Sequence, residues 1–209
     1  MILCDIGNTT FHFKSNNKEF KLFHNEDFPN LNEIIYFISV NQKATNKLLK
    51  KFPNSINIEK FIKFDTSYVG MGIDRKVACL NIKNAIIVDA GSAITVDVVE
   101  NSKHSGGFIL PGITALASVY PNISEKLKFE LNQNINLNSI PLNTNNAINY
   151  AIFQSIILPI KNIDNNYNII FTGGDGLMLS KYFKNSLYNK NLIFDNIKQL
   201  LDKMQKDNR

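Results

Sequence analysis

Residues 87–97 read IVDAGSAITVD: an apolar run ends in an Asp-x-Gly-Ser turn, and a run of alternating apolar and polar residues follows. Residues 2–11, ILCDIGNTTF, have the same pattern, so that Asp5 aligns with Asp89 and Gly7 with Gly91. We expect each copy to form a buried strand, a tight glycine turn and a second strand. Two copies predict an α/β protein with two similar halves that face each other across a cleft.

The two turns have the composition of a phosphate-binding site. Glycine adopts φ > 0 readily and has no side chain, so backbone N–H groups can approach an anion closely. Asn8 and Ser92 add short polar groups. A carboxylate next to a phosphate is repelled, so Asp5 and Asp89 suit such a site only if a cation lies between them and the oxygens, as Mg²⁺ can. An ordinary hairpin would explain one copy, because Asp-x-Gly turns are common, but the duplication favours phosphate binding.

Composition bounds the class of protein. The chain has 209 residues, enough for one large domain or two small ones, and 44% hydrophobic residues with 15 Phe, enough for a packed core. We expect no signal peptide and no membrane span, and a cytoplasmic location. Cys4 and Cys79 lie in apolar surroundings and are predicted to be buried thiols. The net charge of +5 leaves nucleic-acid binding as a weak alternative, because the lysines are scattered.

The first half of the chain predicts a small α/β unit. The apolar run at residues 34–40 favours a buried parallel strand, although its spacing also fits the end of a helix. Residues 44–52 are predicted to be helical and residues 56–64 to form a strand. Asp74 follows two glycines and is expected in the first turn of a helix, where it could accept a proton from a substrate hydroxyl, with Arg75 fixing an anionic group. The alternative is that Asp74 caps the helix and Arg75 is a surface residue.

The second half repeats the theme and ends in helices. Residues 106–112 predict a strand that ends at Pro-Gly, and residues 113–120 a helix. Thr144 precedes an apolar stripe at helical spacing, so we expect it to be an N-cap, and its hydroxyl could equally face a ligand. Residues 167–176 predict a strand and a glycine-rich turn, on which a flat or anionic ligand could lie against bare backbone. The stripe formed by Ile197, Leu200, Leu201 and Met204 predicts a core helix.

Five motifs in this order resemble type III pantothenate kinases through nearly the whole chain: Asp5-x-Gly7-Asn8-Thr9, Gly72-x-Asp74-Arg75, Asp89-x-Gly91-Ser92-Ala93, Gly106-Gly107-x-Ile109-x-Pro111-Gly112 and Thr172-Gly173-Gly174. The resemblance implies an actin-like, sugar-kinase-like fold with two ribonuclease-H-like domains around an ATP cleft. We expect these domains at residues 1–83 and 84–209. It also implies ATP-dependent phosphorylation of pantothenate to 4'-phosphopantothenate, the first step of coenzyme A synthesis, by a homodimer that needs Mg²⁺ and a monovalent cation, K⁺ or NH₄⁺.

The resemblance also implies roles for single residues. Asp74 would accept the proton of the pantothenate hydroxyl, Asp89 would ligate the monovalent cation and Asp5 is a candidate for magnesium. The ATP contacts would come from Asp5, Ile6, Gly7, Asn8, Thr9, Thr10, Phe11, His12 and Ser92. The pantothenate contacts would come from Tyr68, Gly72, Ile73, Asp74, Arg75 and Thr144. This chain has Ser92 where the family usually has Thr, and it is shorter than most members.

Three other functions stay open at this stage: a non-catalytic ATP-binding protein, a nucleic-acid-binding protein and another small-molecule kinase of the same superfamily. A P-loop kinase is disfavoured, because the sequence has no Gly-x-x-x-x-Gly-Lys-Ser/Thr motif. A non-catalytic ATP-binding or regulatory protein of the same fold would not need an acceptor such as Asp74. Another small-molecule kinase of the same superfamily is the nearest alternative, and only the resemblance of Gly72-x-Asp74-Arg75 favours pantothenate over other substrates. We expect neither a membrane nor a nucleic-acid partner.

Overall fold

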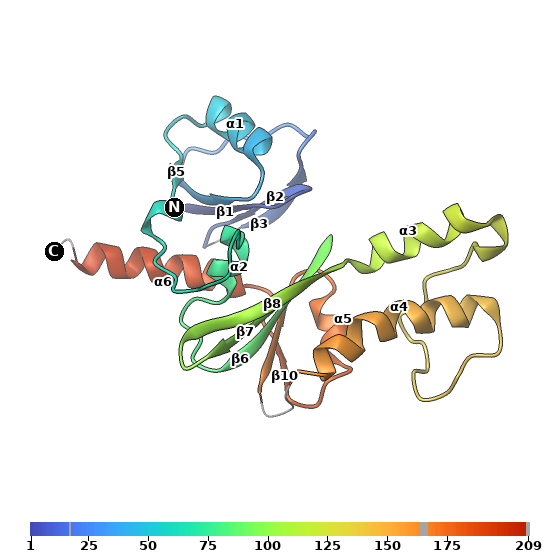
Figure 1. Ribbon diagram of the computed structural model, residues 1–209. Helices are drawn as coiled ribbons and strands as arrows, with labels where there is room; N and C mark the ends of the chain where they lie inside the picture. The colour runs from blue at the N-terminus through green and yellow to red at the C-terminus, as the bar shows by residue number, and fades with distance from the viewer. Residues whose placement is uncertain (17, 164–166, 208–209) are drawn as a thin grey trace. The chain divides into compact units, whose positions relative to one another are not determined.

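The computed structural model describes residues 1–16, 18–163 and 167–207 (Figure 1). The chain forms two compact units, Met1–Ile82 with Asn191–Arg209, and Lys83–Lys190. Each unit contains a five-stranded sheet. No helix in the described part of the chain has both the length and the apolar character needed to cross a bilayer.

The first sheet has the strand order β3-β2-β1-β4-β5. Its strands are β1 (Ile2–Ile6), β2 (Thr10–Lys14), β3 (Glu19–Phe23), β4 (Ile35–Ser39) and β5 (Ile56–Asn57). β2 runs antiparallel to β1 and β4 runs parallel to it. The strand predicted at residues 34–40 is therefore confirmed, and its helical alternative is wrong, because the run is buried within the sheet. The strand predicted at residues 56–64 is mostly wrong, since only Ile56–Asn57 is extended and a 3-10 turn, η1 (Glu59–Phe61), follows.

Helices cover the first sheet. α1 (Gln42–Lys51) starts at Asn41, whose side chain accepts a hydrogen bond from the Ala44 N–H at 3.0 Å. Ala44 and Leu48 of α1 pack into a core with alternate residues of β1, β2 and β4. α2 (Ile73–Ala78) and α6 (Leu192–Asp207) pack against each other, and α6 also contacts β1. Since side chains alternate along a strand, Asp5 projects from the face of β1 opposite Cys4 and Ile6.

The final segment belongs with the first unit, whereas the sequence grouped residues 191–209 with the second domain. α6 packs through its apolar stripe, in which Ile197 and Leu201 are buried. The buried Asn196 side chain donates a hydrogen bond to the Val77 carbonyl of α2 at 2.8 Å. A sequence pattern shows that such a helix has an apolar face, but not which sheet will cover that face.

The second sheet has the order β10-β9-β6-β7-β8. Its strands are β6 (Ala85–Ala90), β7 (Ala93–Glu100), β8 (Lys103–Pro111), β9 (Ile169–Thr172) and β10 (Ser186–Tyr188), and α5 (Gly176–Ser180) joins the last two. β6 is antiparallel to β7 and parallel to β9, as β1 is to β2 and β4. Because α1 likewise joins β4 to β5, the two units repeat one topology, and the duplication predicted from the two turns is confirmed.

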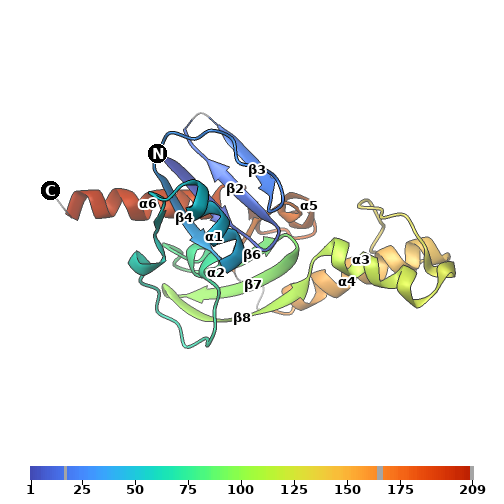
Figure 2. The ribbon, with the colours of Figure 1, turned by 90° about the horizontal axis from the view of Figure 1, so that it is seen from above.

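The second unit has an insertion that the first lacks. Between β8 and β9 the chain forms α3 (Ile113–Ile123), the 3-10 turn η2 (Glu125–Leu127) and α4 (Thr144–Lys161). α3 and α4 lie side by side in both views (Figures 1 and 2). The inner face of α4, including Ile152, Phe153 and Ile156, is buried in the core of the second unit. β3 and β4 of the first unit are joined instead by a segment without helix.

Candidate active site

The first turn joins β1 to β2 in the first unit. The Gly7 N–H donates to the Thr10 carbonyl at 3.0 Å, and the Val40 N–H donates to the Ile6 carbonyl at 3.0 Å. The side chains of Ile6 and Phe11 are fully buried. Of the predicted ATP contacts, these two residues can therefore offer only backbone atoms to a ligand, whereas Asn8 and Thr9 at the tip are exposed.

Gly7 and Gly91 do not have the backbone conformation that we expected. Among the described glycines, φ is positive only at Gly70, Gly106 and Gly173. A Cβ on Gly7 would meet only the Thr10 carbonyl oxygen at 3.8 Å, and one on Gly91 only the Ala93 carbonyl oxygen at 3.9 Å. These are ordinary van der Waals distances. The fold itself thus tolerates a larger residue at both positions, and the missing side chains leave room for a ligand to approach the backbone of each turn.

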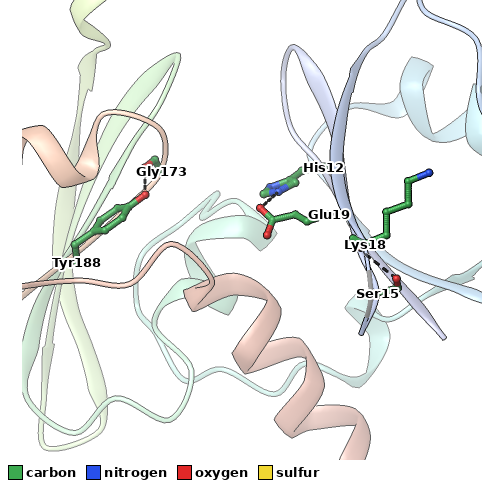
Figure 3. Close-up of polar contacts among 6 residues, drawn as sticks. All are labelled: His12, Ser15, Lys18, Glu19, Gly173 and Tyr188. Carbon is green, nitrogen blue, oxygen red and sulfur yellow. Dashed lines mark hydrogen bonds and ion pairs between the residues drawn. The ribbon is translucent and has the colours of Figure 1, made fainter.

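His12 is engaged by its own unit. Its Nε2 lies 3.1 Å from Glu19 Oε1 (Figure 3), and its ring packs edge-on against Phe194 at a centroid distance of 4.7 Å. A side chain held from two sides is poorly placed to reach for a nucleotide. The contacts of His12 therefore help to hold the loop in place.

Asp74 lies in the first turn of α2, as predicted, and Gly72 is the residue before the helix. The Asp74 Oδ1 accepts a hydrogen bond from the Arg75 N–H at 2.8 Å. A Cβ on Gly72 would lie 2.5 Å from Asp74 Oδ1 and 3.8 Å from Val40 Cγ1. Because Val40 is hydrogen-bonded to Ile6, the start of α2 lies beside the carboxyl ends of β4 and β1, which places Asp74 near the Asp5 turn.

Arg75 is buried, with 5% of its surface exposed, so its interpretation as a surface residue is wrong. Its guanidinium lies 4.6 Å from the centroid of the Tyr68 ring, a cation–π contact that fixes both side chains. Ile73 is also buried at 5% exposure. The predicted pantothenate residues Tyr68 and Arg75 thus form one contact pair, while Ile73 packs into the core.

The thiol nearest to this turn has no chemical role. Cys4 is fully buried next to Asp5. Burial, followed by the negative charge of Asp5, raises the pKa of the Cys4 thiol well above its usual value, which keeps it protonated and unreactive. Cys4 and Cys79 are both buried thiols, as predicted.

The second turn is enclosed by two further glycines of its own unit. The Gly91 N–H donates to the Ala93 carbonyl at 3.0 Å, and the Gly112 N–H donates to the Ser92 carbonyl at 3.1 Å. A Cβ on Gly112 would come within 2.3 Å of the Gly91 carbonyl oxygen. The Pro-Gly break after β8 is therefore needed for the chain to pass directly over the turn that holds Ser92.

Gly173 holds the other side of this turn. Its φ is +81°, and a Cβ there would lie 2.3 Å from the Ala90 carbonyl oxygen and 2.5 Å from Asp89 Oδ1. The Asp175 N–H donates to the same Ala90 carbonyl at 3.0 Å, and the Tyr188 hydroxyl donates to the Gly173 carbonyl at 3.2 Å (Figure 3). Neither Gly112 nor Gly173 is among the site residues predicted from sequence, although a glycine directly after a buried strand was a usable signal.

The oxygen atoms at these turns suit cations. The Asp89 carboxylate and the Ala90 carbonyl both point toward Gly173, and carboxylate and carbonyl oxygens are ligands that hard cations prefer. Among the residues that the structure describes, no three His, Cys, Asp or Glu side chains form a metal-binding group. A magnesium ion at Asp5 would therefore take most of its ligands from water and phosphate, which is its usual coordination in kinases.

A cavity of about 520 Å³ adjoins the Gly173-Gly174 turn. It is lined by Gln133, Asn134, Ile135, Gly174, Asp175, Leu177, Met178, Lys181 and Tyr182. Partial burial raises the pKa of the Asp175 carboxyl. The cavity thus lies beside the glycine-rich turn on which the sequence pattern predicts a flat or anionic ligand, and that ligand stays a prediction.

Thr144 does not cap α4, contrary to the prediction. Asn143 is the N-cap, and its side chain accepts a hydrogen bond from the Asn146 N–H at 2.9 Å. Asn is at least as good a cap as Thr. Thr144 instead lines a cavity of about 580 Å³ in the second unit, whose wall is completed by Tyr120, Leu127, Pro141, Leu142, Asn143, Ala147, Ile148 and Ala151.

Solved structures define the class of the fold. The chain is similar to MreB 5 of Spiroplasma citri, with a TM-score of 0.52 and 10% identity over 99% of this chain and 97% of that one. It is also similar to a 2-dehydro-3-deoxygalactonokinase protein from Sinorhizobium meliloti, with a TM-score of 0.55 and 8% identity over 96% and 95% of the two chains. The fold is thus that of the actin-like ATPases and sugar kinases.

The family is defined more narrowly by sequence. Residues 38–165 match the family model of type III pantothenate kinase. Type III pantothenate kinase of Wolinella succinogenes is 39% identical over the whole of both chains, and that of Campylobacter jejuni 44% over 96% of each. A Campylobacter jejuni structure described as a Baf family transcriptional activator has a TM-score of 0.89 and 40% identity over 99% of this chain and 100% of that one. The chain belongs to the type III pantothenate kinase family.

Proposed function

We propose that this protein transfers the γ-phosphoryl group of ATP to pantothenate and forms 4'-phosphopantothenate, the first step of coenzyme A synthesis, in the cytoplasm. The observation that carries the proposal is the similarity to a type III pantothenate kinase over the whole chain, in a sequence that contains Asp5, Asp74 and Asp89. A regulatory protein that only binds ATP would not need a carboxylate at the position of Asp74.

The two glycine turns bind the ATP phosphates in this proposal. Residues 5–12 contribute backbone amides, and the short side chains of Asn8, Thr9 and Ser92 add hydrogen bonds. The room for a Cβ at Gly7 and Gly91 supports this, because the protein has no packing reason of its own for glycine there. The nucleoside end of ATP occupies the cavity next to Gly174, where a flat ring can lie against backbone.

Two carboxylates balance the phosphate charge through cations. Asp5 holds magnesium together with phosphate oxygens, and Asp89 holds the monovalent cation, with the Ala90 carbonyl beside it. A bound cation neutralises charge that develops on the transferred group, which is a large part of catalysis in phosphoryl transfer.

Asp74 is the catalytic residue of the reaction. The primary hydroxyl of pantothenate attacks the γ-phosphorus, the bond from phosphorus to the bridging oxygen breaks, and ADP leaves. Asp74 orients the hydroxyl and accepts its proton as the new bond forms, as an aspartate does in protein kinases. Its placement beside the end of β1 supports this role. Tyr68, Gly72, Ile73, Arg75 and Thr144 are the pantothenate contacts, Ile73 through its backbone.

A homodimer completes the proposal. Large apolar side chains are exposed along the insertion of the second unit, including Val119 and Ile123 of α3, Ile140 at 75% and Leu142 at 99% exposure. Several large apolar side chains exposed on one insertion are the kind of surface that interaction sites use. A second copy of the chain is the occupant that the family resemblance implies.

The test is a coupled ATP assay with pantothenate, run in parallel with potassium and with sodium. We expect magnesium-dependent turnover that falls sharply in sodium, and a kcat about 10²–10⁴-fold lower in Asp74→Asn, the usual loss for a missing acid–base group. The ATP Kd of Asp74→Asn, measured by calorimetry, should be unchanged. Turnover of other substrates but not pantothenate would refute the function. Equal rates in both salts would refute only the assignment of Asp89.

A further inference from the structure

A separate cavity of about 320 Å³ lies at the other end of the second sheet, where β6 and β9 begin. Its inner wall consists of the buried residues Ile86, Ile160 and Ile169. Ile86 pairs with Ile169 and Asp89 pairs with Thr172, so both strands run from the cavity toward the second turn. At about 3.3 Å per residue, the cavity lies roughly 10 Å along β6 from Asp89.

Aromatic rings form the side walls of this cavity, and their apolar faces line its interior. Tyr167, Tyr182 and Phe183 line it. The Tyr167 hydroxyl donates to the Glu100 carboxylate, and the Tyr182 hydroxyl donates to the Gln133 carbonyl at 3.1 Å. Because both hydroxyls are hydrogen-bonded to other segments, the rings act as apolar walls. Apart from the two lysines, Asn185 is the one polar aliphatic residue among the described lining residues, so the interior favours an apolar body and offers few hydrogen-bond partners to a polar one.

Two cations line the same cavity. Lys161 and Lys184 are exposed, and the Lys161 ammonium lies 5.7 Å from the centroid of the Phe183 ring. Among residues 1–16, 18–163 and 167–207, neither lysine forms an ion pair with a carboxylate. Two carbonyls at the end of α4 are occupied, since the Asn162 and Ile163 amides donate to Leu158 and Ile160 at 3.0 and 3.3 Å. Within the described residues, the opening thus presents two ammonium groups over a largely apolar interior.

We propose that this cavity binds a small monocarboxylate with an apolar body, the body against the isoleucines and the carboxylate next to Lys161 and Lys184. Its volume falls at the lower end of the range for small-molecule sites. Neither substrate of the proposed reaction suits it, because the phosphates of ATP and the amide and hydroxyls of pantothenate would lose water against walls that offer few hydrogen-bond partners. The site is therefore additional to the catalytic one.

The test compares three probes with the same eight-carbon chain: octanoate, octan-1-ol and octylamine, titrated into the full-length protein by calorimetry and by NMR. We expect octanoate to bind most tightly, octan-1-ol more weakly and octylamine most weakly. NMR shifts should fall on the residues that line the cavity. Equal affinity for octanoate and octylamine, or shifts confined to other regions, would overturn the proposal.

Two variants locate the site. Lys161→Gln with Lys184→Gln should weaken octanoate binding about 3- to 10-fold, the range for one or two solvent-exposed ion pairs, and leave octan-1-ol unchanged. The matched control, Lys103→Gln with Lys126→Gln, removes the same charge from elsewhere in the second unit and should change neither. Ile163→Trp should fill the cavity and abolish binding of both probes in protein whose circular dichroism is unchanged. Undiminished binding to Ile163→Trp would refute the site.

Discussion

The two glycine turns have the same position in their sheets but different support. Asp5 pairs with His12 and Ile38, and Asp89 pairs in the same way with Thr95 and Thr172. The loop between the strands is residues 7–9 in the first unit and residues 91–92 in the second. The backbones of Gly112 and Gly173 lie in close contact with the second turn. In the first unit, no other described glycine lies in close contact with the first turn.

The difference shows that glycine is present for two different reasons at these turns. Gly112 and Gly173 are required by the fold, because a Cβ on either would meet backbone atoms closer than 3.0 Å. Gly7 and Gly91 are not, so their use is best explained by a ligand that approaches the turn. The duplicated motif thus has a glycine without a packing role in both units, while only the second unit carries an enclosing shell of further glycines.

The largest expected effect follows from breaking that shell. Gly173→Ala would force a Cβ onto a residue at φ +81° and against the Ala90 carbonyl and Asp89. We expect the free energy of unfolding to fall by about 3 kcal/mol or more, since strain and steric overlap add. Urea denaturation measures this change. Gly174→Ala is the matched control, because nothing lies within 4 Å of its Cβ position, and it should change stability by less than about 1 kcal/mol.

Gly7→Ala and Gly91→Ala should leave stability nearly unchanged and weaken ATP binding. Both positions have room for a Cβ and no positive φ, so stability should change by less than about 1 kcal/mol. If phosphates lie against these turns, the added Cβ should hold them away from the neighbouring donors, and the KM for ATP should rise roughly 10- to 100-fold, the cost of losing a hydrogen bond to a charged group. Normal KM values in both variants would show that the turns do not hold phosphate.

Removing a single hydrogen bond from the shell should have a smaller effect. Tyr188→Phe deletes the hydroxyl that donates to the Gly173 carbonyl at 3.2 Å. We expect a loss of about 1 kcal/mol of unfolding free energy by urea denaturation, the typical net value of such a bond. Tyr150→Phe in the same unit is the control, because its hydroxyl makes no hydrogen bond to the described residues. Equal losses in the two variants would mean that the bond does not support the turn.

The smallest expected effect is a change in how the stability of the fold depends on pH. Partial burial raises the pKa of Asp175 above its ordinary value of 3.8, so the ionised form is disfavoured in the folded state. The stability that a raised carboxyl pKa confers is present below pH 3.8 and lost as pH rises through the folded pKa. Asp175→Asn should therefore gain slightly in stability over the unmodified protein between pH 4 and pH 7.5, as urea midpoints would show. Asp202→Asn, on an exposed part of α6, should show no such trend.

The sequence by itself determined both glycine hairpins and the place of Asp74 in a helix. Period-two patterns and Asp-x-Gly turns predicted both hairpins, and the Gly-x-Asp-Arg motif predicted Asp74 in a first helical turn, because these features depend on neighbouring residues alone. The buried thiols were predictable for the same reason, since both cysteines stand in apolar runs.

Only the tertiary structure decided which surfaces meet. It assigned α6 to the first unit, buried Arg75 against Tyr68, moved the cap of α4 from Thr144 to Asn143 and turned His12 toward Glu19 and Phe194. It also separated the glycines that packing requires from those that it does not. Each of these outcomes depends on contacts between residues far apart in the chain or on competition between adjacent caps, and a local pattern contains neither.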